Sequence, residues 1–554
     1  MDKKLINVRC RNNGQTIEAE IGCRISDVLP QLNLNMPLPP MVVKVNNRVV
    51  GLNYRLFGNK TLEFLDITSE AGMRAYIKTL YMVLCKAVRD LYPEARVKIE
   101  FSVCNGYFCR LFLGRDITPD DACEIRQKMQ EIIAADVHIH RHQQPTEDVV
   151  KKLEARGETS KVNLIKSLGE MYTTFYSLDD YSDNYYGPVL TQTGLLTVFG
   201  LEMFADGLLL RVPQRNDPTK LAPFVKQNKM LDVFQQYHEW QEKMQIGNVG
   251  DLNQAIISGH SNDMINVFEA LQDKQLMRVA DDIKSRHNIR VVLIAGPSSS
   301  GKTTTCKRLS IQLITNGMRP VGISLDDYFL DREQTPKDEN GEYDFESLYA
   351  LNLELFNQNI SDLIEGKEVE LPRYNFVEGK SEMSGKKLKL MPNEVLVIEG
   401  IHALNPSLIT QVDNSQIYRV YASALTTIML DDHNYIHTTD NRLLRRMIRD
   451  HKYRGTSAQQ TLHRWASVRA GENKWIFPYQ ENADAMINTA ILFELAVIKT
   501  QAEPLLEQVP ENSDEYSEAY RLREFLRYIK PMPENQIPPT SLLREFLGGS
   551  SFEY

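Results

Sequence analysis

The chain has 554 residues, 42% of them hydrophobic and 25% charged, with a net charge of −9. At roughly 100–200 residues per domain, this length is too great for one hydrophobic core and predicts several domains. The acidic balance argues against a protein that coats nucleic acid, because such proteins are usually basic, and leaves room only for a local basic patch.

The sequence contains no sign of export or of membrane insertion. The N-terminus has no apolar run of signal-peptide length, and no stretch approaches ~18 consecutive apolar residues. The 7 cysteines are scattered without a CxxC pair. Scattered cysteines in a long chain are typical of reduced thiols. We therefore expect a cytoplasmic protein with no membrane contact.

Residues 1–67 predict a small mixed domain with a sheet, because "TIEAEI", "MVVKVNNRVVG" and "TLEFLDI" alternate polar and apolar residues. The stretch "VNNRVVG" predicts a hairpin, since asparagine tolerates the positive φ of a tight turn.

Residues 68–215 predict an α+β domain. An apolar stripe runs through "RAYIKTLYMVLCKAVRDLYP", where Pro93 ends the expected helix. Strands are expected on both sides of Asn105-Gly106. A second helix follows in "TPDDACEIRQKMQEII", with Thr118 as its cap. We place a domain boundary near residue 215, in "PQRNDPTK".

The second half of the chain changes character. Residues 216–288 predict a polar helical connector. Over 289–505 the apolar strands "RVVLIAG", "RPVGISLDDYF" and "EVLVIEG" alternate with helices, which predicts a parallel α/β sheet flanked by helices. Residues 506–554 predict a helical tail with an amphipathic helix in "AYRLREFLRYIK". From Pro531 onward we expect loose chain, apart from a short helix near Ser541.

A phosphate cradle opens this second half. "GPSSSGKT" matches GxxxxGK[ST] in full and lies between a buried strand and a helix. Its backbone N–H groups can surround phosphate oxygens, Lys302 brings a positive charge to the β and γ phosphates, and Thr303 can ligate Mg²⁺. We expect ATP or GTP as the nucleotide. The predicted contacts are Gly296, Ser298, Ser299, Ser300, Gly301, Lys302, Thr303 and Thr304.

Acidic residues follow the next two strands. "SLDDYF" offers Asp326 or Asp327 to accept the proton of an acceptor hydroxyl. Glu399 ends "VLVIEG", where it can hold Mg²⁺ directly or through water. A surface acid or helix cap is the ordinary alternative for a single residue of this kind. Two such acids beside a phosphate cradle favour the catalytic interpretation.

An arginine-rich helix is predicted in "DNRLLRRMIRDHKYRG". Arg442, Arg446 and Arg449 share one face. A solvated charged face is the usual alternative. Beside a phosphate cradle, the pattern favours a lid that places cations over the transferring phosphoryl group.

Together these motifs resemble the uridine kinase/phosphoribulokinase family over roughly 290–500. The resemblance implies that Asp326 is the catalytic base and that Glu399 ends the acidic strand. "RRMIRD" is similar to the family's lid, which implies phosphate roles for Arg446 and Arg449, and the Arg454-Gly455 pair also matches.

The resemblance extends to the acceptor pocket. "YDFESL" implies that Asp344 holds the ribose hydroxyls beside Tyr343. "LPRYNFVEG" implies that Tyr374 and Phe376 form walls around the base. Two base-reading positions of the family depart here. A histidine is replaced by Gly379 and an arginine by Thr456. Without these partners the pocket cannot reject other bases strongly.

The first half resembles other families. Residues 1–67 are similar to a TGS domain, and residues 68–215 to the editing domain of threonyl-tRNA synthetase, on "CNGYF" and "RGETSKVNLI". The positions that match the family's histidine and cysteine ligands carry other side chains, and only Gly187-Pro188 is retained. These positions are Met82, Lys86, Tyr185 and Val189. Metal binding or ester hydrolysis is therefore not expected there.

The sequence predicts ATP-dependent phosphorylation of a uridine- or cytidine-like nucleoside on its 5′-hydroxyl. One alternative is a kinase for another small hydroxyl compound. The other is an RNA-binding or regulatory protein that uses the cradle as a nucleotide switch. The N-terminal region is a candidate for binding RNA or a small ligand, and a homo-oligomer is compatible with the sequence.

Overall fold

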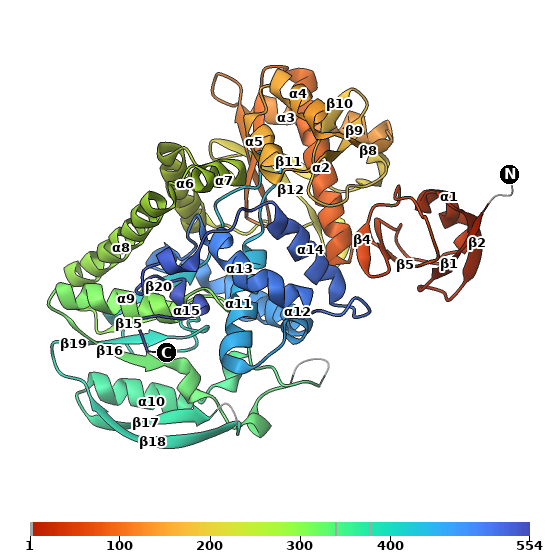
Figure 1. Cartoon of the computed structure of the whole chain (residues 1–554). Coiled ribbons are helices and arrows are strands. Elements are labelled where there is room, and N and C mark those ends of the chain that lie inside the picture. The colour runs from red at the N-terminus through yellow and green to blue at the C-terminus, as the bar shows by residue number, and fades with distance from the viewer. Residues whose placement is uncertain (1–3, 338–340, 376–377, 554) are drawn as a thin grey trace.

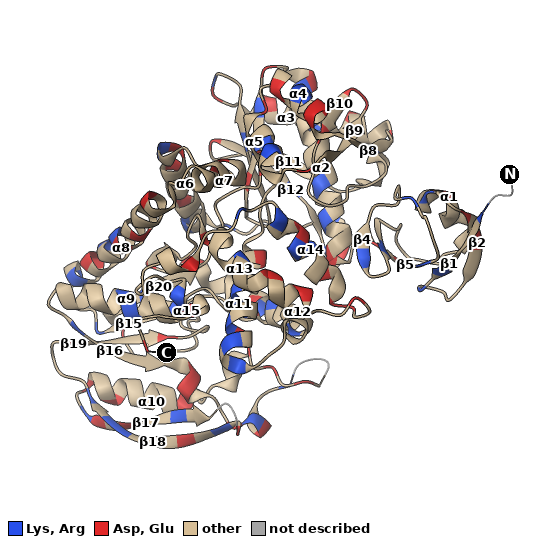
Figure 2. Cartoon of the chain, viewed as in Figure 1, with Lys and Arg blue, Asp and Glu red and all other residues tan. Residues whose placement is uncertain are grey.

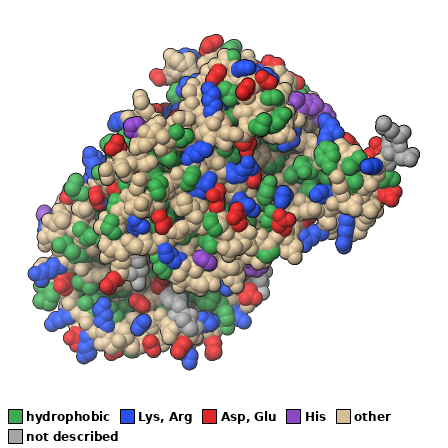
Figure 3. Space-filling view, in the orientation of Figure 1, with side chains coloured by type: hydrophobic (Ala, Val, Ile, Leu, Met, Phe, Trp, Pro, Cys, Tyr) green, Lys and Arg blue, Asp and Glu red, His purple; other side chains and the backbone are tan. Residues whose placement is uncertain are grey.

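The computed structural model describes residues 4–337, 341–375 and 378–553 (Figure 1). Within these ranges, none of the helices combines the length and the hydropathy needed to span a bilayer. Acidic and basic side chains are interspersed on the visible face (Figure 3).

The N-terminal sheet lies at one end of the molecule (Figure 1) and has the strand order β2-β1-β5-β3-β4. Its hydrophobic core is its own. The predicted hairpin is present, and Asn46 and Asn47 occupy its turn with φ of 47° and 64°. The elements are β1 Leu5–Cys10, β2 Thr16–Glu20, α1 Ile25–Val28, β3 Val42–Val45, β4 Arg48–Val50 and β5 Lys60–Leu65.

The next part of the chain packs two sheets around α2 Glu70–Leu91, which is buried along most of its length. Thr118 caps α3 as predicted, because its side chain accepts from the Asp121 N–H. The remaining elements are β6 Arg96–Val103, β7 Gly106–Phe112, α3 Pro119–Ala134, β8 Ile139–Pro145, α4 Thr146–Ala155, α5 Thr159–Leu168, β9 Tyr172–Leu178, β10 Tyr181–Asp183, β11 Gly200–Phe204 and β12 Gly207–Arg211.

The stretch "PQRNDPTK", where we placed a domain boundary, is a two-stranded ribbon, β13 Pro213–Gln214 paired with β14 Asp217–Leu221. Three helices follow it: α6 Asn228–Met244, α7 Val249–Ile257 and α8 Ser261–Ser285. The last of these packs on the sheet that comes after it.

The parallel sheet has the order β16-β19-β15-β20-β21, and all its pairings are parallel. Alternate residues of β15 point to opposite faces of the sheet. Val291 and Leu293 pack with α10, whereas Val292 and Ile294 pack with α8 and α9. This doubly covered sheet confirms the predicted α/β class. The elements are β15 Val291–Ala295, α9 Lys302–Thr315, β16 Arg319–Ser324, α10 Leu353–Ile364, β19 Glu394–Glu399, β20 Ile417–Ser423 and β21 Ala485–Asn488.

Peripheral elements complete this half. β17 Glu368–Asn375 and β18 Lys380–Lys389 form a separate ribbon. The helices α11 Thr438–Arg454, α12 Ala458–Trp475, α13 Glu494–Glu507 and α14 Tyr516–Arg527 share one core. Lys and Arg are prominent on α11 and α14 (Figure 2).

The expectation of loose chain beyond Pro531 was wrong. Met532, Ile537, Leu543 and Leu547 are buried in the same core as α11, α13 and α14. Met532 and Ile537 lie outside any regular helix, and only Leu543 and Leu547 have helical spacing, so the pattern did not indicate that the whole segment is buried. The short helix expected near Ser541 is present as α15, Arg544–Leu547.

Candidate functional site

The phosphate cradle connects β15 to α9. Gly296 passes so close to β20 that a Cβ would lie 1.9 Å from the Ala422 carbonyl oxygen, and Gly301 has a φ of 82°. Both positions therefore require glycine. The hydroxyls of Ser299 and Ser300 are buried and have no hydrogen-bond partner among the described residues. Unpaired donors beside a helix N-terminus fit phosphate oxygens.

The two predicted metal ligands lie together. The Thr303 hydroxyl donates to Glu399 Oε1 over 3.0 Å. Burial raises the pKa of Glu399 to about 7, and the Lys302 ammonium partly opposes this shift. A hydroxyl and a carboxylate are oxygen ligands of the kind that Mg²⁺ prefers, so the pair fits that ion.

The arginines of α11 divide into two groups. Arg442 and Arg445 are fully buried and form ion pairs with Glu472 and Glu494. Arg442 Nη1 also donates to the Ser298 carbonyl oxygen over 3.0 Å. These two arginines therefore hold the helix against the cradle and the core.

Arg446 is the arginine whose guanidinium donates to a cradle side chain, because its Nη1 lies 2.9 Å from Ser298 Oγ. Arg449 and Arg454 each form an ion pair with Asp450, at 3.5 and 3.2 Å. Helix α11 packs against the protein core along much of its length.

Asp326 lies in a single 3-10 turn after β16, at the carboxyl end of the parallel sheet. Its carboxylate is exposed and close enough to Glu399 and Glu346 to raise the pKa of both. The neighbouring Asp327 is half-buried and accepts from the Tyr374 N–H, so its carboxylate is engaged in the fold. Asp326 is therefore the better placed of the two to accept a proton.

The predicted acceptor residues differ in exposure. Tyr374 is buried, with its ring 5.5 Å from that of Phe329, and Tyr343 is 37% exposed. Asp344 Oδ1 accepts from the Glu346 N–H. Phe376 lies outside the described residues.

Gly379 has an unexpected neighbour. The Arg332 guanidinium lies within 3 Å of the place where a Cβ of residue 379 would be, and the Arg332 N–H donates to the Gly379 carbonyl. An arginine thus lies beside the position where the family resemblance implies a histidine.

Two carboxylates on the cradle were missed by sequence reasoning. Glu545 Oε2 accepts from Thr304 Oγ1 at 2.6 Å and from the Thr304 N–H at 3.3 Å. Glu472 Oε1 accepts from the Ser298 N–H at 3.0 Å. Burial opposes ionisation of Glu472, but Arg442 and Arg469 outweigh it and lower its pKa. No motif marks these contacts, because their partners are 241 and 174 residues away.

The editing-like positions are filled by packing residues. Met82, Tyr185 and Val189 are buried. Lys86 forms 3.0 Å ion pairs with Asp90 and Asp180. The structure therefore provides no metal ligand at any of the four positions.

Residues 291–492 match the family model described as "Phosphoribulokinase / Uridine kinase family". This part of the chain is a domain of that family. The kinase-family domain contains the cradle, Asp326, Glu399 and α11. Its parallel sheet and cradle have the strand–loop–helix arrangement of a P-loop.

The N-terminal region is similar to threonine–tRNA ligases. The enzyme from Clostridium kluyveri is 31% identical over 183 residues, 33% of this chain and 29% of that one. The enzyme from Acetivibrio thermocellus is 31% identical over 205 residues, 37% of this chain and 32% of that one. The chain thus spans less than a third of the length of these relatives.

Two solved structures give weak overall superpositions. One is a putative fructose transport system kinase from Silicibacter sp. TM1040, at 15% identity and a TM-score of 0.27, covering 38% of this chain and 98% of that one. The other is a possible uridine kinase from Bacillus stearothermophilus, at 21% identity and a TM-score of 0.21, covering 24% and 70%.

Proposed function

We propose that this protein transfers the γ-phosphoryl group of ATP to the 5′-hydroxyl of a uridine- or cytidine-like nucleoside. The observation that carries the proposal is the meeting of the cradle with Glu399 at Thr303 and with Arg446 at Ser298. A mere phosphate-binding turn would need neither group. A kinase needs both, to organise a metal ion and to stabilise charge on the transferring group.

Each side chain then has a chemical role. Lys302, Arg446 and Arg449 stabilise negative charge on the phosphates, and the free hydroxyls of Ser299 and Ser300 can donate to phosphate oxygens. Asp326 accepts the proton from the acceptor hydroxyl. Thr303 and Glu399 would hold Mg²⁺, which neutralises phosphate charge when bound.

The C-terminal segment has to be displaced before the cradle is complete. Glu545 occupies the N–H and hydroxyl of Thr304, which directly follows the motif and is one of the predicted nucleotide contacts. A carboxylate and a phosphate cannot share these donors, because both are anions that accept the same hydrogen bonds. Binding of ATP therefore requires Glu545 to leave.

A second acceptor class is favoured by one observation. Arg332 lies against Gly379, and a guanidinium suits a phosphorylated acceptor at least as well as a neutral base. A phosphorylated sugar is thus the competing substrate.

A screen of acceptors with Mg-ATP separates the two. Uridine, cytidine, adenosine and guanosine, their deoxy forms and a set of sugar phosphates are each supplied to the full chain, and ADP release is measured. We expect the highest kcat/KM with a pyrimidine ribonucleoside. A higher value with a sugar phosphate would contradict the proposed acceptor.

A further inference from the structure

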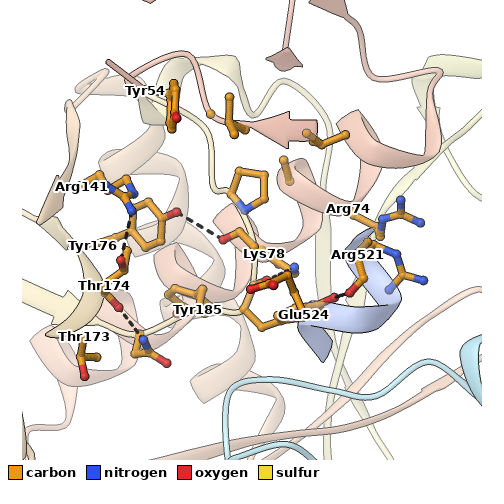
Figure 4. Close-up of a pocket in the computed structure, with 18 of the residues that line it drawn as sticks. Tyr54, Arg74, Lys78, Arg141, Thr173, Thr174, Tyr176, Tyr185, Arg521 and Glu524 are labelled. Carbon is orange, nitrogen blue, oxygen red and sulfur yellow. Dashed lines mark hydrogen bonds between the residues drawn. The ribbon is translucent and has the colours of Figure 1, made fainter. Parts of the chain in front are cut away.

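A cavity of about 410 Å³ lies where the N-terminal sheet, α2, the β8–β9 sheet and α14 meet (Figure 4). None of the cradle residues lines it. The retained Gly187-Pro188 pair forms part of its wall. This volume lies in the range of small-molecule pockets. None of the roles assigned to the kinase-family domain uses it.

Cations outnumber acids in the lining. The cations are Arg74, Lys78, Arg141, Arg521 and Arg527, and the acids are Glu170 and Glu524. Three of the arginines already have acidic partners: Arg74 pairs with Glu518, Arg521 with Asp440 and Glu518, and Arg527 with Glu170 and Glu524.

Lys78 and Arg141 differ from these three, because neither forms an ion pair within the part of the chain that the structure describes. Arg141 Nη2 donates to Thr174 Oγ1 over 3.1 Å. Lys78 donates to the Tyr186 carbonyl oxygen and lies 4.6 Å from the centre of the Tyr186 ring. Burial, with smaller contributions from Arg74 and Arg521, lowers the pKa of Lys78 to about 7. A bound anion would offset that cost.

The rest of the lining contains tyrosines, polar side chains and aliphatic side chains. Tyr54, Tyr176 and Tyr185 surround the same space as Arg141 and Lys78 (Figure 4). The side-chain nitrogen of Asn53 is buried there without a hydrogen-bond partner among the described residues. Tyrosine rings can stack on a flat ring, and an unpaired amide donor suits an acceptor oxygen.

We propose that this cavity binds a nucleoside monophosphate, with its phosphate on Arg141 and Lys78 and its base among the tyrosines. Arg141 and Lys78 have no acidic partner among the described residues, so both can donate to an anion, and the aromatic walls favour a flat ring over a simple inorganic ion. A nucleoside monophosphate is also the terminal unit of an RNA chain, so the test includes a tRNA.

The inference is tested by calorimetric titration of the full chain carrying Lys302→Ala, which weakens phosphate binding at the cradle. Uridine and adenosine 5′-monophosphates, inorganic phosphate, uridine and a tRNA are titrated separately. The titrations are repeated with Arg141→Gln, with Lys78→Met and with the control Arg126→Gln. Arg126 is on α3 and is not part of the cavity lining.

We expect a monophosphate to bind and Arg141→Gln to weaken its binding at least tenfold, because a charge-assisted hydrogen bond is lost. Arg126→Gln should change nothing, and uridine should be insensitive to Arg141→Gln. Thermal unfolding shows whether Lys78→Met still folds, and Arg141→Gln carries the test if it does not.

Three results would overturn the inference: no monophosphate binding, equal binding with and without Arg141, or Arg141-dependent binding of tRNA alone. Binding is measured independently of turnover. A chain that binds monophosphate through Arg141 but has no kinase activity would refute the proposed function and leave this inference standing.

Discussion

At the scale of single residues, the cradle was predictable and its carboxylate neighbours were not. Gly296, Gly301 and Thr303 belong to a local motif whose spacing follows from the geometry of one turn. Glu545 and Glu472 reach the cradle only through the tertiary fold, so no local pattern could indicate them. Likewise, the helical period placed Arg442 beside Arg446, but only packing shows that Arg442 is committed to Glu472.

Asp326→Asn should lower kcat by about 10²–10⁴-fold, because the amide cannot accept the hydroxyl proton. Binding of ATP should be retained. Asp327→Asn is the matched control, since Asp327 is held by the Tyr374 N–H. Steady-state kinetics and ATP titration measure both variants. An Asp326→Asn enzyme of near-normal kcat would refute the assignment.

The Glu346 carboxyl should make the free energy of unfolding depend on pH. Burial and the nearby Glu472 charge raise its pKa to about 7, although Arg446 and Lys302 partly oppose the shift. A raised folded-state pKa means that stability is present below the unfolded pKa and is lost as pH rises through about 7. Glu346→Gln cannot ionise. Its free energy of unfolding, relative to the natural protein, should increase between pH 5 and pH 8 by up to about 3 kcal/mol. Denaturant unfolding without nucleotide measures this, and a difference independent of pH would count against the shift.

At the scale of elements, the alternation of strand residues and the capping of helices could be predicted from the sequence. The packing of the C-terminal segment could not. The β15 residues alternate between two cores, and Thr118 caps α3, because both features depend on near neighbours. Residues 531–547 are held by separate contacts with α11 and α13. The residues that make these contacts do not recur at a regular spacing in the sequence.

Glu545→Gln should lower the KM for ATP several-fold, because it removes a negative charge that competes for Thr304. The amide keeps the shape of the side chain, so packing of α15 is preserved. Glu534→Gln is the control in the same segment, since Glu534 binds Gln501 and does not contact the cradle. An unchanged or higher KM for ATP in Glu545→Gln would show that the carboxylate does not compete with nucleotide.

At the scale of the whole molecule, the two halves meet in a buried charge cluster. His433 of the kinase-family domain lies 2.6 Å from Asp183 of the synthetase-like region, which also pairs with Lys161. Asp183→Asn would remove the acidic partner of His433 and leave Lys161 with only Asp431, at 3.5 Å. We expect a loss of about 3–5 kcal/mol in the free energy of unfolding. Asp180→Asn removes a largely exposed carboxylate and leaves Lys86 its second partner, Asp90, so it should cost about 1 kcal/mol or less. Urea unfolding compares them, and equal costs would mean that the cluster does not hold the halves together.

The central claim is phosphoryl transfer to an acceptor hydroxyl, and the fate of a labelled γ-phosphate tests it most directly. The full chain is incubated with γ-labelled ATP, Mg²⁺ and uridine or cytidine, and the labelled products are separated. The account predicts label in the nucleoside 5′-monophosphate. Label found only in inorganic phosphate, with either nucleoside, would contradict it.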